Sequence, residues 1–178
     1  MRRHCLFIFL AASCFLASRP ANAQVYGTDK GSISFSSDAP LELIKASSNE
    51  MKGRFDVSKK LFAFSIKITS FTGFNSPLQR EHFNENYMES SIYPKAKFKG
   101  KIDNLAIVNF SKDGQYNVNV TGALEIHGVT KTVTTPAVIT IKGGAVSARS
   151  KFAVAIADYK IEVPKLVAEN IAEKVNIE

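Results

Sequence analysis

The chain has 178 residues, of which 45% are hydrophobic, and a formal net charge of +7. This length is ample for one domain with its own core and short for two. The basic excess is mild for a chain of this size, so it gives no strong case for a nucleic-acid partner.

Residues 1–23 have the organisation of a secretory signal peptide. Arg2 and Arg3 precede an apolar run from Cys5 to Ala17, and Ala21-Asn22-Ala23 matches an A-x-A cleavage site. The apolar run is too short to span a membrane. We therefore expect this segment to direct export and to be removed.

Cleavage after Ala23 leaves a mature domain of residues 24–178, which we expect in the bacterial periplasm. Both cysteines, Cys5 and Cys14, fall in the removed segment, so the mature domain has no disulfide and no thiolate metal ligand. The removed segment also contains three arginines. The mature domain therefore keeps 20 of the 23 basic residues against 16 acidic ones, which gives a net charge of +4. Secretion from the cell and a lipid anchor on Cys14 are the alternatives.

The mature chain alternates apolar and polar residues with a period of two. The pattern is clear over residues 62–68, 115–126 and 146–156, and it predicts antiparallel strands with one buried and one wet face. Residues 95–101 carry lysines at every second position. That lysine face either stays solvated and discourages edge pairing, or steers the protein into transient contact with an anionic membrane surface.

Turn and helix signals separate the strands. Asp113-Gly114 and Gly143-Gly144 predict tight hairpins, and His127-Gly128 predicts a looser connection. Ser76-Pro77 is typical of a helix start and predicts a short helix over Leu78 to Met88.

A second short helix is expected near the end of the sequence. Pro164 introduces it over Lys165 to Glu173, and a last strand follows at Val175 to Glu178. Many strands joined by short turns indicate an all-β sandwich or closed barrel, in a single domain.

Catalysis is poorly supported by the residues of the mature chain. It contains no H-E-x-x-H, G-x-S-x-G or phosphate-binding glycine motif. Its two histidines, His82 and His127, are far apart in the sequence. A hydrolase or isomerase would require both to converge with an acidic residue, so we expect no enzyme, no metal and no cofactor.

Inward-facing aromatic residues are the most informative remaining feature. Alternation places six phenylalanines on buried faces, and these form either the domain's own core or the wall of a cavity for an apolar ligand. They are Phe35, Phe55, Phe62, Phe64, Phe98 and Phe152.

Four segments resemble the YceI-like family. They are Phe71-Thr72-Gly73-Phe74, the stretch from His82 to Ser90, the stretch from Tyr93 to Gly100, and the stretch from Gly122 to Lys131, which is similar to the family's G-x-L-x-(I/L)-x-G-V-T-K turn. The resemblance covers essentially the whole mature chain. The motif N-E-N-Y-M-E-S is similar to the corresponding motif in a branch of the family found in Bacteroidetes-type bacteria.

This resemblance implies a single lipocalin-like antiparallel β-barrel of about eight strands, with one or two short helices. Members of the family bind polyisoprenoid chains, of the kind carried by quinones and prenyl pyrophosphates, in a long hydrophobic cavity. Motif and alternation together place these residues at the cavity: Phe62, Phe64, Phe71, Phe74, Phe83, Tyr87, Met88, Phe98, Leu124, Phe152 and Val154. His82 and Asn86 would form its polar rim.

Two functions of different class follow from the sequence. The first is a periplasmic carrier or buffer for a long-chain isoprenoid lipid. The second is a structural or stress-response interaction protein whose barrel is filled by its own side chains. The family's commoner Arg-x-x-(F/W)-G segment is replaced here by Lys151-Phe152-Ala153-Val154, so the resemblance does not transfer the identity of the lipid.

Overall fold

The computed structural model describes residues 24–178, and the predicted signal peptide lies outside the described residues. Within them, nine strands form one sheet in which paired neighbours run antiparallel. The strands are β1 (Val25–Asp38), β2 (Leu43–Asp56), β3 (Leu61–Lys67), β4 (Lys95–Ile102), β5 (Gly114–Ile126), β6 (Val129–Lys142), β7 (Ala145–Ser150), β8 (Phe152–Ala155) and β9 (Lys174–Ile177).

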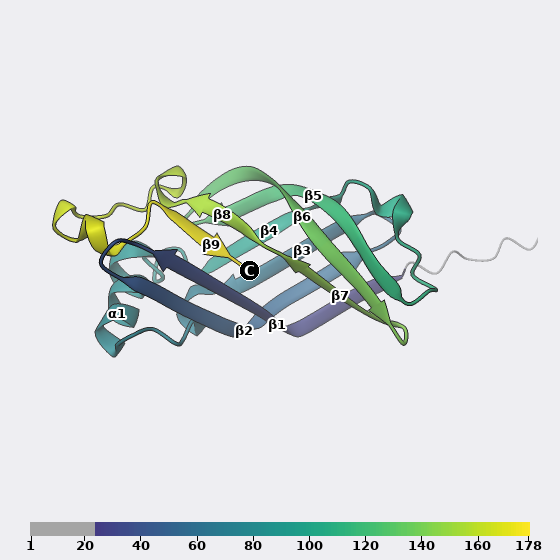
Figure 1. The fold of residues 1–178 in the computed structure, drawn as a ribbon, viewed down its shortest axis with the longest axis horizontal. Helices are drawn as coiled ribbons and strands as arrows, with labels where there is room; N and C mark the ends of the chain where they lie inside the picture. Colours follow the sequence, from purple (N-terminus) through teal and green to yellow (C-terminus); the bar gives the residue numbers. More distant parts are fainter. Residues whose placement is uncertain (1–23) are drawn as a thin grey trace, which may run out of the picture.

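The sheet curls into a nearly closed barrel (Figure 1). Its strand order is β7-β6-β5-β4-β3-β2-β1-β9-β8. Only Lys151 separates β7 from β8: Ser150 pairs with β6, whereas Phe152 pairs with β9. The chain therefore passes from one edge of the sheet to the other. The predicted antiparallel barrel is confirmed, and it has nine strands because the alternating run at residues 146–156 breaks at Lys151.

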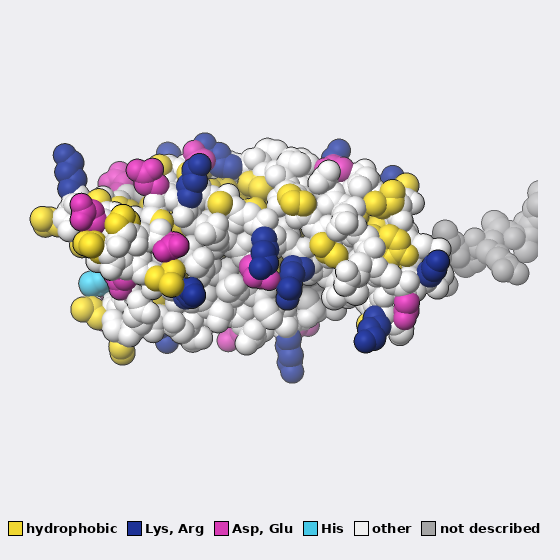
Figure 2. Space-filling model, in the orientation of Figure 1, with side chains coloured by type: hydrophobic (Ala, Val, Ile, Leu, Met, Phe, Trp, Pro, Cys, Tyr) yellow, Lys and Arg dark blue, Asp and Glu magenta, His cyan; other side chains and the backbone are white. Residues whose placement is uncertain are grey.

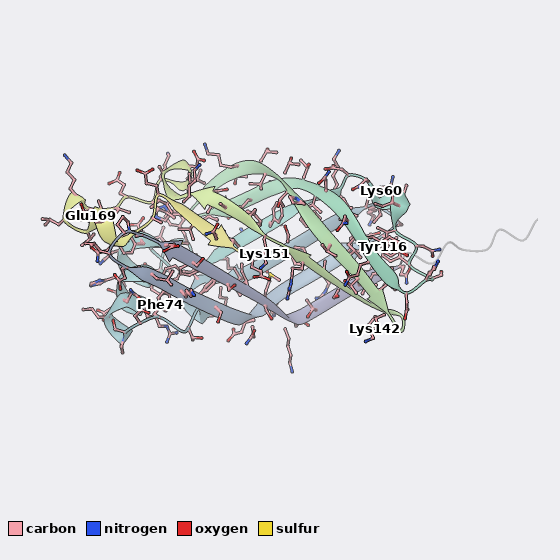
Figure 3. The ribbon with its side chains drawn as sticks, in the orientation of Figure 1. Lys60, Phe74, Tyr116, Lys142, Lys151 and Glu169 are labelled. Carbon is pink, nitrogen blue, oxygen red and sulfur yellow. The ribbon has the colours of Figure 1, made fainter. Side chains whose placement is uncertain are left out.

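The connections between strands gather at the two ends of the barrel. Lys60 and Lys142 mark one end, and Phe74 and Glu169 mark the other (Figure 3). The second end carries the β1–β2 and β5–β6 turns and residues 71–94, which join β3 to β4 (Figure 1). Residues 71–94 are called the closing segment below.

Helices are short and lie mainly at the second end. In α1 (Pro77–His82), proline occupies the first turn and the Gln79 amide donates to Ser76 Oγ at 3.1 Å. A π-helical turn, η2 (Phe83–Tyr87), continues it, so the predicted helix is confirmed with a wider last turn. The 3₁₀ turns are η1 (Ile68–Ser70), η3 (Leu105–Ile107), η4 (Ile156–Tyr159) and η5 (Lys165–Asn170).

The helix predicted from Lys165 is observed as η5, which ends at Asn170 rather than Glu173, and the predicted last strand is β9. The tight turn predicted at Gly143-Gly144 is confirmed, with positive φ at both residues. The looser connection predicted at His127-Gly128 is wrong: only these two residues separate β5 from β6, and both have positive φ, so the turn is equally tight. The hairpin predicted at Asp113-Gly114 is wrong. Residues 103–113 form a long β4–β5 connection, and Asp113 Oδ1 instead accepts a 2.9 Å hydrogen bond from the Gly143 amide.

The largest cluster of buried core residues lies toward the end of the barrel away from the closing segment. Nine buried residues meet there: Phe62, Ile102, Leu105, Val108, Val118, Val120, Ala137, Ile139 and Ile141. All six phenylalanines that alternation placed inward belong to the core or pack against it, which confirms that prediction. The predicted lysine face of β4 is also confirmed, since Lys95, Lys99 and Lys101 are exposed.

Candidate functional site

Four of the predicted cavity residues form a continuous row of rings inside the barrel. The ring centroids of Phe64 and Phe62 lie 5.6 Å apart, those of Phe62 and Phe98 5.0 Å, and those of Phe98 and Phe152 6.1 Å. These spacings and their tilted geometries are typical of favourable aromatic pairs. The row, called the central row below, brings together β3, β4 and β8.

Glycines on the neighbouring strands make room for these rings. A Cβ atom on Gly53 of β2 would lie 2.5 Å from Phe64 Cε1, and one on Gly122 of β5 would lie 2.9 Å from Phe98 Cε2. Gly122 also pairs with Gly100 across β4 and β5. Only a residue without a side chain allows such a close approach of ring to backbone.

The central row is not fully covered by its neighbours. Phe62 is buried, with 6% of its surface exposed, but Phe64, Phe98 and Phe152 are only partly buried although they point inward. Inward rings that keep accessible surface present apolar area to anything that enters the barrel.

The predicted aromatic residues of the closing segment form a second group around Phe35 of β1. Phe83 stacks on Phe35 with centroids 5.2 Å apart, and it lies 5.0 Å from Phe74 and 5.8 Å from Phe71. Phe71 is buried at 5% exposure. These rings therefore pack on one another and on the barrel's own wall, and they close this end of the barrel with apolar surface.

Three further predicted cavity residues connect the two aromatic groups. Met88 and Leu124 are buried in one cluster, and Val154 packs against it together with Phe83 and Phe98. Tyr87 lies at the end of η2 and is partly buried. Its burial raises the pKa of the Tyr87 phenol, so this group stays a neutral hydrogen-bond donor.

His82 and Asn86, the predicted polar rim, lie apart from these rings. Both side chains are exposed on the outer side of the closing segment. Among residues 24–178, neither forms a side-chain hydrogen bond or ion pair. They are close in sequence to Phe83 and Tyr87, but a contact between them and a headgroup stays a prediction.

The sequence reasoning missed a polar junction at the same end of the barrel. His127 Nε2 lies 2.6 Å from Glu89 Oε2, and its Nδ1 lies 3.1 Å from the carbonyl oxygen of Tyr159. The junction thus joins the closing segment, the β5–β6 turn and η4. His127 does meet an acidic residue, but the second histidine that an enzyme was expected to need, His82, is exposed elsewhere. No sequence signal pairs Glu89 with His127, because 38 residues separate them.

Two shallow hollows lie on the outside of the closing segment. One of about 470 Å³ is bordered by Phe74, Arg80 and Asn84, and a second of about 600 Å³ shares Arg80 and Asn84. Phe74 is the one residue of the predicted cavity set that borders either of these two hollows. Both are therefore separate from the central row.

Exposed hydrophobic side chains occur toward both ends of the molecule (Figure 2). Leu78 and Leu166 are 57% and 96% exposed at the end of the closing segment, and Leu61 and Ile107 are 49% and 52% exposed at the other. The surface thus does not single out one end. In the described part of the chain, no cluster of three potential metal ligands occurs, and no helix has the length and apolar character needed to cross a bilayer.

The fold and the apolar row inside it define a small antiparallel β-barrel protein. The sequence profile of the YceI-like domain matches residues 25–178. The chain therefore belongs to the YceI-like family, as the resemblance implied. No curated protein matches it. The Bacteroidetes-type branch suggested by residues 84–90 receives no support from these comparisons and stays a prediction.

Solved structures share the barrel at low sequence identity. A polyisoprenoid-binding domain from Saccharophagus degradans, implicated in plant cell wall breakdown, has a TM-score of 0.72 at 17% identity, covering 87% of this chain and 94% of that one. Burkholderia cenocepacia BcnA has a TM-score of 0.66 at 18% identity, covering 82% and 91%. A Campylobacter jejuni YceI protein has a TM-score of 0.51 at 18% identity, covering 99% and 94%. At these identities the likeness establishes the fold alone.

Proposed function

We propose that this protein binds a long-chain polyisoprenoid lipid, such as a quinone or prenyl lipid, inside its barrel and carries or sequesters it in the periplasm. The observation that supports this proposal best is the central row, whose inward rings keep accessible apolar surface. The chain of the lipid would lie along Phe64, Phe98 and Phe152. No covalent chemistry and no further cofactor is part of the function.

The physical driving force would be burial of apolar area. Removing hydrocarbon from water contributes about 25 cal/mol per Å², or about 0.8 kcal/mol for each CH₂ group. A row of rings makes no directional demand on the chain, so affinity should follow the length of the isoprenoid more than its headgroup. His82 and Asn86 are the side chains proposed to meet the headgroup at the closing segment.

Three further points support the proposal. The related domain from Saccharophagus degradans is described as polyisoprenoid-binding. The predicted signal peptide would deliver the mature domain to the periplasm, where an apolar lipid needs a protein shell to leave a membrane. The exposed lysines of β4 would favour transient contact with an anionic membrane surface.

A second candidate function is supported by the filled end of the barrel and by the packing of Phe71, Phe74 and Phe83 on Phe35. Aromatic side chains that already bury one another's surface need no ligand to cover them. On this alternative, the protein is an exported structural or stress-response interaction protein, and a modest rearrangement of Phe64, Phe98 and Phe152 completes the core.

Organic extraction of the mature protein, purified from the periplasm, separates the two candidates. On the lipid-binding function, mass spectrometry of the extract finds an isoprenoid in stoichiometric amount, and protein emptied by extraction and refolding takes up an added isoprenoid quinone or prenyl alcohol. An extract without isoprenoid, together with no uptake of either added lipid, would contradict the proposal and favour the structural alternative.

A further inference from the structure

The junction at His127 requires two N–H donors on one imidazole ring. A carbonyl oxygen can only accept, so Nδ1 must carry a proton to bond Tyr159. A carboxylate can also only accept, so Nε2 must carry one to bond Glu89. Only the imidazolium form has both protons. When the ring is neutral, one of the two bonds is lost whichever tautomer it takes.

The surroundings of the ring leave Glu89 as its charged partner. His127 retains 10% of its side-chain exposure, and the Tyr93 ring meets it edge-on with centroids 4.7 Å apart. The other titratable side chains on the adjoining elements are Arg80, Glu81, His82, Glu85, Tyr87 and Tyr93 of the closing segment, Glu125 and Lys131 beside the β5–β6 turn, and Asp158, Tyr159 and Lys160 in and after η4. Within residues 24–178, only Glu89 lies within ion-pair distance of the imidazole, while Glu125 pairs with Lys97. Burial and the charge of Asp158 raise the pKa of the Tyr159 phenol, so that group stays neutral near neutral pH.

The junction holds one side of the closing segment, and different contacts hold the other. Thr72 and Ser47 exchange two backbone hydrogen bonds of 2.8 Å, which anchor the start of the segment to β2. Gln79 Nε2 also donates to Glu42 Oε1 at 2.8 Å. None of these contacts involves His127. A change in the protonation of His127 would therefore loosen the later part of the segment, residues 83–94, and leave its start attached.

Two features of residues 83–94 make local release feasible. They begin with the π-helical turn η2, a conformation that is less favourable than a regular α-helix. Glu89 itself has a positive φ of 42°, which is uncommon for a residue with a side chain. The junction and the packing of Met88 and Phe83 hold this conformation in place.

We propose that the Glu89–His127–Tyr159 junction is a proton-dependent fastening for the closing segment. While His127 is doubly protonated, it holds the segment and η4 against the end of the barrel. When the proton leaves, one of its bonds breaks and residues 83–94 or η4 open more often. Given the proposed lipid-binding function, this opening would speed the passage of an isoprenoid chain to and from the central row.

Hydrogen–deuterium exchange of the lipid-free mature protein tests the fastening without any ligand. After correction for intrinsic exchange rates, we expect exchange of residues 83–94 and 156–161 to rise by about tenfold between about pH 5 and about pH 8. Tenfold corresponds to losing one hydrogen bond worth about 1.4 kcal/mol. Peptides from β5 and β6 should not change.

The variant Glu89→Gln is the discriminating change. Its amide can donate to Nε2 of a neutral ring whose Nδ1 still donates to Tyr159, so both bonds survive and the pH dependence should disappear. Glu85→Gln is the matched control, because it makes the same change at an exposed carboxylate of the same segment that forms no side-chain hydrogen bond or ion pair within residues 24–178; its pH dependence should equal that of the wild type. An unchanged wild-type profile across this range, or the same rise in Glu89→Gln, would overturn the proposal. This measurement uses lipid-free protein, so a failure of the proposed fastening can be told apart from a failure of the proposed lipid-binding function.

Discussion

The central row makes a quantitative prediction, because two of its neighbouring rings differ in how well they are covered. Phe62 is 6% exposed, whereas Phe98 is only partly buried, although the centroids of the two rings lie 5.0 Å apart. Truncating a fully buried phenylalanine to alanine destabilises a protein by about 3–5 kcal/mol. We expect Phe62→Ala to lower the free energy of unfolding by about 4 kcal/mol, and Phe98→Ala by about 2 kcal/mol, because fewer neighbours lose contact with the second ring.

The two variants should rank in the opposite order for lipid binding. A ring that contributes its accessible face to an isoprenoid chain contributes about 1.5–3 kcal/mol to the complex, so Phe98→Ala should weaken binding by roughly tenfold or more. Phe62→Ala should change it less, since that ring offers little free surface. Urea unfolding of the lipid-free proteins gives the first ranking, and titration with an isoprenoid quinone, followed by quenching of tyrosine fluorescence, gives the second.

Equal losses of stability in the two variants would refute the reasoning, because they would mean that Phe98 is as tightly enclosed as Phe62. Unchanged quinone affinity in Phe98→Ala would likewise show that the central row does not contact the lipid. Phe62→Ala serves as the matched control, since it removes the same group from the adjacent strand.

Three further predictions concern the wall of the barrel and its surface. Gly122→Ala should destabilise the fold by about 2 kcal/mol or more, because its Cβ would lie 2.5 Å from the Lys99 carbonyl oxygen, whereas Gly114→Ala, with 3.4 Å to its nearest neighbour, should be tolerated in the same urea titration. Hydrogen bonds from a neighbouring serine and lysine lower the pKa of the Asp56 carboxyl from 3.8 to about 2. The carboxylate should therefore stabilise the fold above pH 3.8, and this stabilisation should be lost as the pH falls through about 2. The difference in thermal midpoint between wild type and Asp56→Asn should vanish over that range, and a difference that does not depend on pH would contradict the prediction. Replacing Lys99 and Lys101 with glutamine should reduce sedimentation with anionic vesicles and leave the quinone affinity unchanged, and equal sedimentation would remove the lysine face from any role at membranes.

The residues by themselves determined several features that depend on neighbours in the chain. Alternation over residues 62–68 and 95–101 sets which side chains face inward, because successive side chains of a strand point to opposite faces. Ser76 and Pro77 determined where α1 starts, and Gly143-Gly144 where β6 turns into β7, because capping and positive φ are properties of a few adjacent residues.

Tertiary structure alone decided what depends on residues that meet across the barrel. Asp113 has the sequence signature of a hairpin, yet its carboxylate binds the turn at Gly143, thirty positions away. Lys151 lies in an alternating run, yet the strand breaks there. Closing the barrel requires the chain to stop pairing with β6 before Lys151 and to start pairing with β9 after it. The contact between Glu89 and His127 has no local signal, since it exists only once the closing segment and the β5–β6 turn arrive at the same end of the barrel.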